Sequence, residues 1–210
     1  MESLRDIVLS DLKSNLNHGI LVSRLTYLIA KEMKLDEDMC YEMAVAGMVH
    51  DIGKMRLSPY LYGRNRDSLA VEEMQYMRMH SKISYDILQY YDFTYFTLET
   101  VLHHHECYDG SGYPDNLVGE DIPIGARVLK VADSFAALIS DRPYRKAFSY
   151  EAAVDIMIDE VKNYDMEVFI AFQRIIHEPK TIEIIENSSL VFDGIENLIY
   201  MDEQEEMKNG

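Results

Sequence analysis

The chain places a histidine and an aspartate side by side, His50-Asp51, at the start of a run HDIGK that ends at Lys54. The pair directly follows an apolar run, Met43 to Val49, that is typical of a helix. Adjacent polar residues often close a helix and face water, so this pair alone is a weak indication of chemistry. Its meaning depends on whether the rest of the chain supplies further ligands.

Further imidazoles and carboxylates occur along the chain. Three consecutive histidines, His103 to His105, end another apolar run and precede Glu106. Because consecutive helical residues point about 100° apart, two adjacent histidines can each face a different metal, but three cannot serve one. Asp133 interrupts the apolar run Ile124 to Ile139, where an unpaired carboxylate is costly without a cation or a hydrogen-bonding network. The candidate ligands are His18, His50, Asp51, His80, His104, His105 and Asp133.

A mostly imidazole set with carboxylates that can bridge suits Fe, Mn, Zn or Ni better than Ca or Mg, which prefer oxygen ligands. Seven protein ligands exceed the need of one tetrahedral site. They suit two metals about 3.5–4 Å apart, bridged by a carboxylate and a water-derived hydroxide. Asp51 is the natural bridging acid. Such a pair supplies a nucleophile at neutral pH and neutralises the oxygens of a phosphodiester.

Several motifs in the chain together resemble an HD-GYP domain. They are HDIGK at residues 50–54, HHE at 104–106, DGSGYP at 109–114, VAD at 131–133 and SDRPYRK at 140–146. The resemblance covers roughly residues 15 to 178. It implies the all-helical fold of the HD superfamily and hydrolysis of cyclic di-GMP, or of a related cyclic dinucleotide.

The resemblance also assigns roles to residues by position. It implies that all seven candidates bind metal and that Asp51 and Lys54 are catalytic, with Lys54 contacting a substrate phosphate. The signature loop beside the substrate would contain Gly112, Tyr113 and Pro114, and Arg142 and Arg145 would contact phosphate or guanine. Glu106 is expected to accept a hydrogen bond from a ligand histidine. His103, which precedes the motif, is expected to be structural.

Two departures from the family pattern matter. Some members carry a glutamate one helical turn before the first ligand histidine, where it completes a third metal position. Here that position is Ser14, a poor metal ligand, so we predict two metal ions. Fe or Mn is preferred over Ni or Zn. The segment Met55 to Ser68 also differs from the usual sequence, which leaves the substrate preference open.

The elements that must position these residues are mostly helical in pattern. We predict helices over residues 4–16, 20–33, 39–49, 98–105, 124–139, 150–161 and 166–176, and another that begins at Ser68 and contains His80. Asn17-His18-Gly19 interrupts the pattern between the first two predicted helices. Asp36 is a candidate N-cap of the helix predicted over 39–49. Gly53 and Pro59 break the pattern after the His-Asp pair, and 60–67 is a polar loop.

The chain changes character after Pro179. Short β-prone runs at 181–185, 190–192 and 195–201, around Asp193-Gly194, predict a small C-terminal β-hairpin. We therefore expect an all-α, HD-superfamily helical bundle over residues 1–178 and an appendage over 179–210, whose last residues are polar.

Length and charge limit the function further. A chain of 210 residues fits one domain with a small appendage. A net charge of −17 argues against DNA or RNA as a partner, although metal ions can reverse the field locally for a phosphorylated ligand. Two cysteines without a CxxC favour a reducing cytoplasm, and neither a signal pattern nor a membrane-spanning run occurs. No sensory domain precedes the motifs, so we expect a stand-alone or excised domain, with a homodimer or a separate regulatory protein left open.

The leading interpretation is a phosphodiesterase in which a metal-bound hydroxide attacks cyclic di-GMP, giving linear pGpG or continuing to GMP. One alternative is a cyclic-dinucleotide receptor or interaction module that turns over poorly. Another is an HD-type phosphohydrolase acting on a different nucleotide, against which the intact loop around Tyr113 argues.

Overall fold

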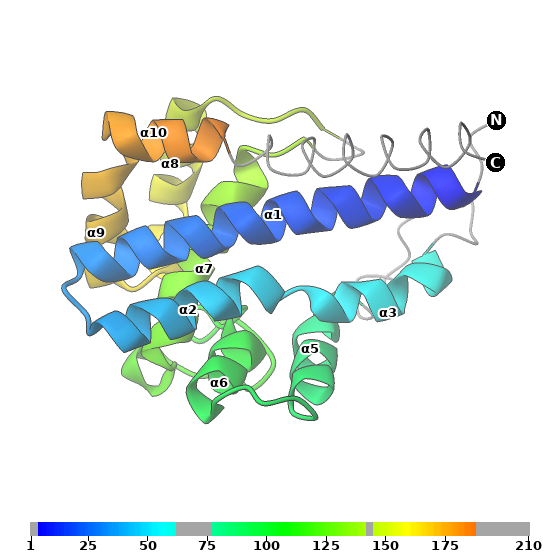
Figure 1. Cartoon of the computed structure of the whole chain (residues 1–210). Helices are drawn as coiled ribbons and strands as arrows, with labels where there is room; N and C mark the ends of the chain where they lie inside the picture. The colour runs from blue at the N-terminus through cyan, green and yellow to red at the C-terminus, as the bar shows by residue number, and fades with distance from the viewer. Residues whose placement is uncertain (1–3, 62–76, 142–144, 188–210) are drawn as a thin grey trace.

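A computed structural model describes residues 4–61, 77–141 and 145–187, and the side chains of all of these except 4–11 and 57–61. Every regular element within these ranges is helical, which confirms the predicted all-α class (Figure 1). The α-helices are α1 (Leu4–Glu32), α2 (Glu37–Val49), α3 (Ile52–Leu61), α5 (His80–Leu88), α6 (Tyr95–His103), α7 (Ile124–Leu138), α8 (Tyr150–Asp159), α9 (Met166–Ile176) and α10 (Pro179–Glu186). Short 3-10 turns cover Gly119–Asp121 and Val161–Asn163. No helix among the described residues has the length and apolar character to cross a membrane.

Helix α7 lies at the centre of the apolar core, behind α1 and α2 in Figure 1. Its side chains Leu129 and Phe135 are fully buried, and the Phe135 ring packs 5.0 Å from that of Phe172 on α9. Leu25 and Ile29 of α1 are buried in the same cluster. Burying each such side chain contributes about 1.5–3 kcal/mol. This packing fixes the helix that carries Asp133.

Helix α1 is continuous, so the predicted break at Asn17-His18-Gly19 is wrong. The glycine serves helix packing instead of ending the helix, because a Cβ at Gly19 would lie 2.7 Å from the Met48 carbonyl oxygen of α2. His18 therefore projects from the middle of a long helix. The predicted cap at Asp36 is confirmed, since its carboxylate accepts a hydrogen bond from the Asp38 N–H at 2.9 Å.

Helix α3 follows the His-Asp pair and contains both Gly53 and Pro59, so the predicted break there is also wrong. Gly53 marks a close contact, since a Cβ there would lie 2.4 Å from the His80 carbonyl oxygen. Its N–H donates to Ser84 Oγ at 2.9 Å. Pro59 stands two residues before the end of the helix, so the proline lies within α3 and does not end it.

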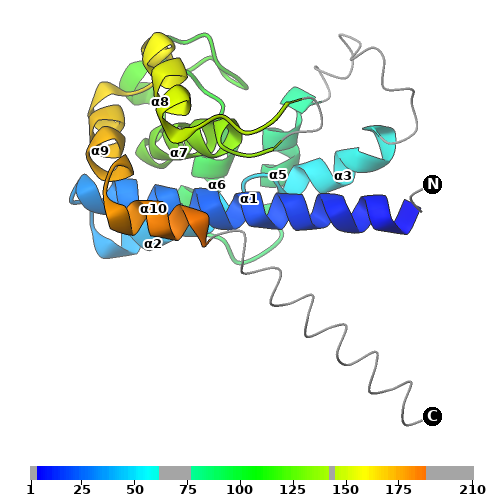
Figure 2. The same cartoon turned by 90° about the horizontal axis from the view of Figure 1, so that it is seen from above.

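The segment 181–185, predicted to be β-prone, is helical and belongs to α10. Pro179 occupies the first turn, where proline favours helix initiation, and Thr181 and Ile185 are buried one helical turn apart. Figure 2 shows α10 alongside α1, and Arg24 Nη1 donates to the Ile184 carbonyl at 3.3 Å. The remaining parts of the predicted hairpin, 190–192 and 195–201 with the turn at 193–194, lie outside the described residues, as do most of 60–67 and the start of the helix predicted at 68.

Candidate metal centre

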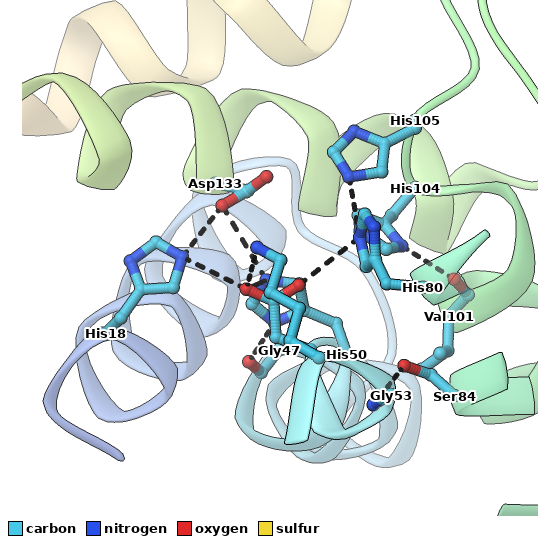
Figure 3. Close-up of polar contacts among 12 residues, drawn as sticks. His18, Gly47, His50, Gly53, His80, Ser84, Val101, His104, His105 and Asp133 are labelled. Atoms are coloured by element: carbon cyan, nitrogen blue, oxygen red, sulfur yellow. Dashed lines mark hydrogen bonds and ion pairs between the residues drawn. The ribbon is translucent and has the colours of Figure 1, made fainter. Parts of the chain in front are cut away.

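The seven predicted ligands converge from five parts of the chain (Figure 3). They form two groups in which the ligand atoms lie within 4.8 Å of one another. We call His18, His50 and Asp133 the acid trio, and His80, His104 and His105 the imidazole trio. A third group, His50, Asp51 and His104, links the two.

Three of the histidines are oriented by the ends of helices. His50 and His104 directly follow the last residues of α2 and α6, where the final carbonyls have no partner within the helix. His50 Nδ1 donates to the Gly47 carbonyl at 2.8 Å, and His104 Nδ1 donates to the Val101 carbonyl at 2.6 Å. His80 Nδ1 makes the same contact with the carbonyl of the residue three before it. Each ring therefore presents Nε2 to the cluster as the ligand atom.

The acid trio is held together by carboxylates. His18 Nε2 lies 2.9 Å from Asp133 Oδ1, and His50 Nε2 lies 3.6 Å from the same oxygen. Asp51 Oδ2 lies 3.3 Å from His50 Nε2 and 3.8 Å from His18 Nε2. Two imidazoles therefore face two carboxylates across one small space.

The imidazole trio has nitrogen facing nitrogen. His80 Nε2 lies 2.9 Å from His105 Nε2 and 3.3 Å from His104 Nε2. In His80 and His104 this nitrogen is the one that the backbone bond of Nδ1 leaves available, so ring nitrogens this close require a cation or a proton between them. Asp51 Oδ1 lies 3.4 Å from His80 Nε2, so the two oxygens of Asp51 face different trios.

The donor set fits divalent metal ions. His50 Nε2 and Asp51 Oδ1 are buried and lack a hydrogen-bond partner among the described residues. Buried polar atoms of this kind are costly unless a partner satisfies them. Imidazole nitrogens with a carboxylate between them are the ligands that Fe, Mn, Zn and Ni accept.

The electrostatic environments of the trios are opposite. Burial lowers the pKa of His80, and lowers those of His104 and His105 well below the usual histidine range. Burial also acts against a charge on His50, but Asp51 and Asp133 outweigh it and raise the pKa of His50 to about 10. His50 and Lys54 outweigh burial at Asp51, and His18 and His50 do so at Asp133, which holds the pKa of each carboxyl group well below its usual range.

Lys54 lies beside the bridging candidate. Its Nζ is 2.5 Å from Asp51 Oδ2, and about a quarter of its side chain (24%) is exposed. The Lys54 ammonium group thus lies at the border between the ligand cluster and solvent. Its predicted contact with a substrate phosphate remains a prediction.

The signature loop packs directly on the imidazole trio. The Tyr113 ring stacks on His105 with centroids 4.8 Å apart, and the Tyr113–Pro114 peptide is cis. Gly112 lies so close to the HHE segment that a Cβ there would be 2.2 Å from the Cys107 nitrogen. Arg78 places its guanidinium 5.4 Å from the centre of the Tyr113 ring. The predicted loop residues therefore lie at the candidate metal centre, with Tyr113 in contact with the candidate ligand His105.

Asp115 fastens this loop, and sequence reasoning missed it. Its carboxylate accepts from His103 Nε2 at 3.0 Å, and its N–H donates to Glu106 Oε1 at 2.7 Å. The expectation that Glu106 holds a ligand histidine is therefore wrong, because helix-end carbonyls do so instead. His103 is structural, as predicted. An aspartate after Gly-Tyr-Pro carries no pattern that separates it from an ordinary turn residue.

The two predicted arginines have different outcomes. Arg142 lies outside the described residues. Arg145 donates to the carbonyls of Ala137 at 2.7 Å and Leu138 at 3.0 Å, so its guanidinium satisfies the end of α7. Its role as a substrate contact remains a prediction. Ser14 is exposed on α1, one turn before His18.

Comparison with known proteins places these residues in a family. A sequence family described as "HD domain" matches residues 2–168. The cyclic di-GMP phosphodiesterase response regulator RpfG of Xanthomonas campestris is 38% identical over 135 residues, covering 63% of this chain and 35% of the relative. A cyclic di-GMP phosphodiesterase of Thermotoga maritima is 36% identical over 161 residues, covering 75% and 44%. The chain thus spans less than half the length of these relatives.

Solved structures share the fold. Bd1817, an HDG"Y"P protein from Bdellovibrio bacteriovorus, matches with a TM-score of 0.64 at 21% identity, covering 79% of this chain and 53% of that one. The cyclic GMP-AMP-specific phosphodiesterase V-cGAP3 of Vibrio cholerae gives 0.63 at 14% identity, covering 87% and 52%. The HD domain of the Listeria monocytogenes phosphodiesterase PgpH, in complex with cyclic di-AMP, gives 0.51 at 16% identity, covering 87% and 91%.

Proposed function

Because the chain belongs to the HD domain family, as its motifs predicted, we propose that it is a metal-dependent phosphodiesterase that hydrolyses cyclic di-GMP. The observation that carries the proposal is the placement of Asp51 between two complete trios of ligands. The proposal is supported by relatives in Xanthomonas and Thermotoga that are named as cyclic di-GMP phosphodiesterases. A relative in Vibrio cholerae, 35% identical over 154 residues, is named as specific for 3'3'-cGAMP, so the linkage and bases of the substrate must be tested directly.

We assign one divalent metal to each trio, with Asp51 between them. Fe or Mn is the first choice, and Ser14 leaves the position next to His18 without a carboxylate for a third ion. When bound, two such ions lower the pKa of water and neutralise charge on phosphate oxygens. All seven protein ligands are then accounted for.

The residues around the ions have separate tasks. Asp51 keeps the two trios at a fixed separation, and the low pKa of its carboxyl keeps it ionised at neutral pH. The partly exposed Lys54 is within reach of a phosphate that approaches Asp51, and attracts it electrostatically. Tyr113 holds His105 by stacking, and burial raises the pKa of its phenol, so it stays neutral and can donate a hydrogen bond.

Turnover and metal content test the proposal together. The full chain is loaded with Fe(II) or Mn(II), its metals are counted, and cyclic di-GMP is followed by chromatography. We expect linear pGpG or GMP and close to two metals per chain. If no product forms with Fe, Mn or Ni, the enzyme hypothesis is rejected and the cyclic-dinucleotide receptor remains. Three metals per chain would contradict the prediction of two metals that rests on Ser14.

A further inference from the structure

The two ends of the metal centre carry charge of opposite sign around them. Figure 3 shows His18 at one end of the cluster and His105 at the other. Burial lowers the pKa of His105, and the positive charge of Lys130 on α7 adds to this effect. The cavity of about 460 Å³ beside His18 has two carboxylates, Asp141 and Glu186, and neither lysine nor arginine among its described lining residues. An anionic group of a ligand is therefore favoured at the imidazole trio and opposed at the acid trio.

Arg78 is an exposed cation at the imidazole trio. It stands just before α5, two residues ahead of the candidate ligand His80. Its guanidinium carbon lies 5.4 Å from the centre of the Tyr113 ring, and that ring stacks on His105 with centroids 4.8 Å apart. One aromatic ring thus contacts both an exposed cation and a candidate metal ligand.

The charge of Arg78 is not neutralised within the described parts of the chain. Among those residues, its guanidinium contacts the Tyr113 ring and no carboxylate. Other arginines are occupied, since Arg127 pairs with Asp165 at 2.5 Å and Arg145 donates to the carbonyls that end α7. In a chain with a net charge of −17, a cation without such a partner beside the centre is available to an anionic ligand.

The contact with Tyr113 also prepares the guanidinium for binding. A planar guanidinium that lies over an aromatic ring keeps the N–H groups along its edges available. Two parallel N–H groups match two oxygens of one phosphate. Because the ring already orders this side chain, binding a phosphate costs less conformational entropy.

We propose that Arg78 binds the phosphate of the cyclic dinucleotide that is not hydrolysed. This inference rests on the proposed function and adds a substrate contact that belongs to none of the sequence motifs. A cyclic dinucleotide has two phosphodiester groups, and one of them must lie at Asp51 for reaction. The other then meets carboxylates beside the acid trio or Arg78 beside the imidazole trio, and its negative charge selects Arg78.

The test compares Arg78→Gln with the wild-type full chain, both loaded with Mn(II), on two diesters. Cyclic di-GMP has the second phosphate, whereas bis(para-nitrophenyl) phosphate has one phosphate and no base. We expect KM for cyclic di-GMP to rise about 10-fold to 100-fold, as for loss of a charged hydrogen bond, with kcat within about 2-fold. The kcat/KM for bis(para-nitrophenyl) phosphate should stay within about 2-fold. An equal loss on both diesters would show that Arg78 acts through Tyr113, and would overturn the proposal.

Lys82→Gln is the matched control. Lys82 also lies over a tyrosine, with Nζ 4.6 Å from the centre of the Tyr85 ring, but it pairs with Asp86 along α5 at 3.2 Å. This variant should leave the kinetics on both diesters unchanged. Arg78→Lys keeps the charge and loses the planar fork, so its KM for cyclic di-GMP should lie between those of the wild type and Arg78→Gln. Equal KM values in Arg78→Gln and Lys82→Gln would overturn the proposal.

Equilibrium binding separates this inference from the proposed activity. Cyclic di-AMP has the same two phosphates as cyclic di-GMP but lacks the O6 acceptor of guanine. In calorimetric titrations of the metal-free chain, we expect Arg78→Gln to weaken binding of both dinucleotides about 10-fold to 100-fold and Lys82→Gln to weaken neither. A loss confined to cyclic di-GMP would assign Arg78 to the guanine edge and overturn the proposal. The expected binding losses without any turnover by the metal-loaded chain would reject the enzyme and keep the phosphate contact. Turnover with identical behaviour of the two variants would do the reverse.

Discussion

The acid trio and the imidazole trio have three ligand residues each, yet they shift histidine pKa values in opposite directions. The pKa of His50 in the acid trio is raised, and the pKa values of the histidines in the imidazole trio are lowered. Asp51 and Asp133 raise the pKa of His50 to about 10, whereas burial lowers those of His104 and His105 well below their usual range. The difference follows from the balance between burial and nearby carboxylates. Two carboxylates outweigh burial at His50, whereas at His80 burial outweighs the one carboxylate that faces it, Asp51.

The trios also differ in what holds them. The acid trio depends on α1 and α7, two long helices whose apolar faces pack in the core. The imidazole trio depends on short helices and on the signature loop, with Tyr113 stacked on His105 and Asp115 bonded to His103. The first is fixed by burial of large apolar faces, and the second by a few polar contacts. Substitutions around the second should therefore be easier to detect without unfolding the chain.

Removing the residue shared by both trios should have the largest effect. Asp51→Ala should lower turnover at least 1000-fold, roughly the loss seen when a group acting on the reacting atoms is removed, and should reduce metal content below two. His50→Ala should also abolish activity. Both variants should keep most of their helical circular dichroism. His103→Ala is the control: this buried histidine bonds to Asp115 outside the cluster, so its loss should cost only the roughly 3-fold to 10-fold expected for one hydrogen bond. Turnover that survives in Asp51→Ala would refute its position between the metals.

Variants confined to one trio should separate the two metals. Asp133→Asn should weaken binding of the acid-trio ion and His105→Gln that of the imidazole-trio ion, each by at least the roughly 10-fold to 100-fold that loss of a ligand's hydrogen-bond partner costs. Titration with a competing chelator should give one weakened and one unchanged site in each variant. If either variant weakens both sites equally, the ligands do not divide as proposed.

Much of this centre could be predicted from residue type and spacing. Helical geometry allowed the adjacent His104 and His105 to face different metals. In the structure α6 ends at His103 and both belong to the imidazole trio, with only His104 also within reach of His50 and Asp51. Asp133 in an apolar run predicted a buried partner, and it faces His18 and His50. The family predicted from the motifs is confirmed.

Other features depend on tertiary contacts that no local pattern contains. Gly19 and Gly53 read as breaks, but each lies inside a helix where a neighbouring backbone comes too close for a side chain. Thr181 to Ile185 read as a strand because four of its five residues are β-branched, while the buried pair one turn apart marks a helix. Glu106 bonds to Asp115 across a loop whose path the sequence does not specify.

The pH dependence of the metal-free chain should show both trios. The pKa values of the imidazole trio are lowered on folding, so its stability is complete above about 6.5 and is lost as pH falls. The pKa of His50 is raised, so its contribution is complete below about 6.5 and is lost as pH rises towards 10.

Each group should shift the melting temperature by about 3–5 °C per unit of pKa difference. Thermal melts from pH 5 to 10 in chelator measure this shift. His105→Gln should reduce the change of melting temperature with pH only on the acid side, and His50→Gln should reduce it only on the alkaline side. A variant that flattens both sides would show that the trios titrate as one unit.

Loosening the loop should have the smallest effect and should reach only the imidazole trio. Asp115→Ala removes the acceptor of His103 but keeps the backbone bond to Glu106, so the loop stays attached and Tyr113 is held less firmly against His105. We expect turnover to fall about 3-fold to 10-fold, as for the loss of one hydrogen bond of about 1 kcal/mol. The chelator titration should show a weaker imidazole-trio metal and an unchanged acid-trio metal. Ser111→Ala is the matched control, because its hydroxyl bonds to Asp109 within the same loop and does not reach the HHE segment. If Asp115→Ala behaved like Ser111→Ala, the stacking of Tyr113 and the backbone bond to Glu106 would be sufficient to hold the loop.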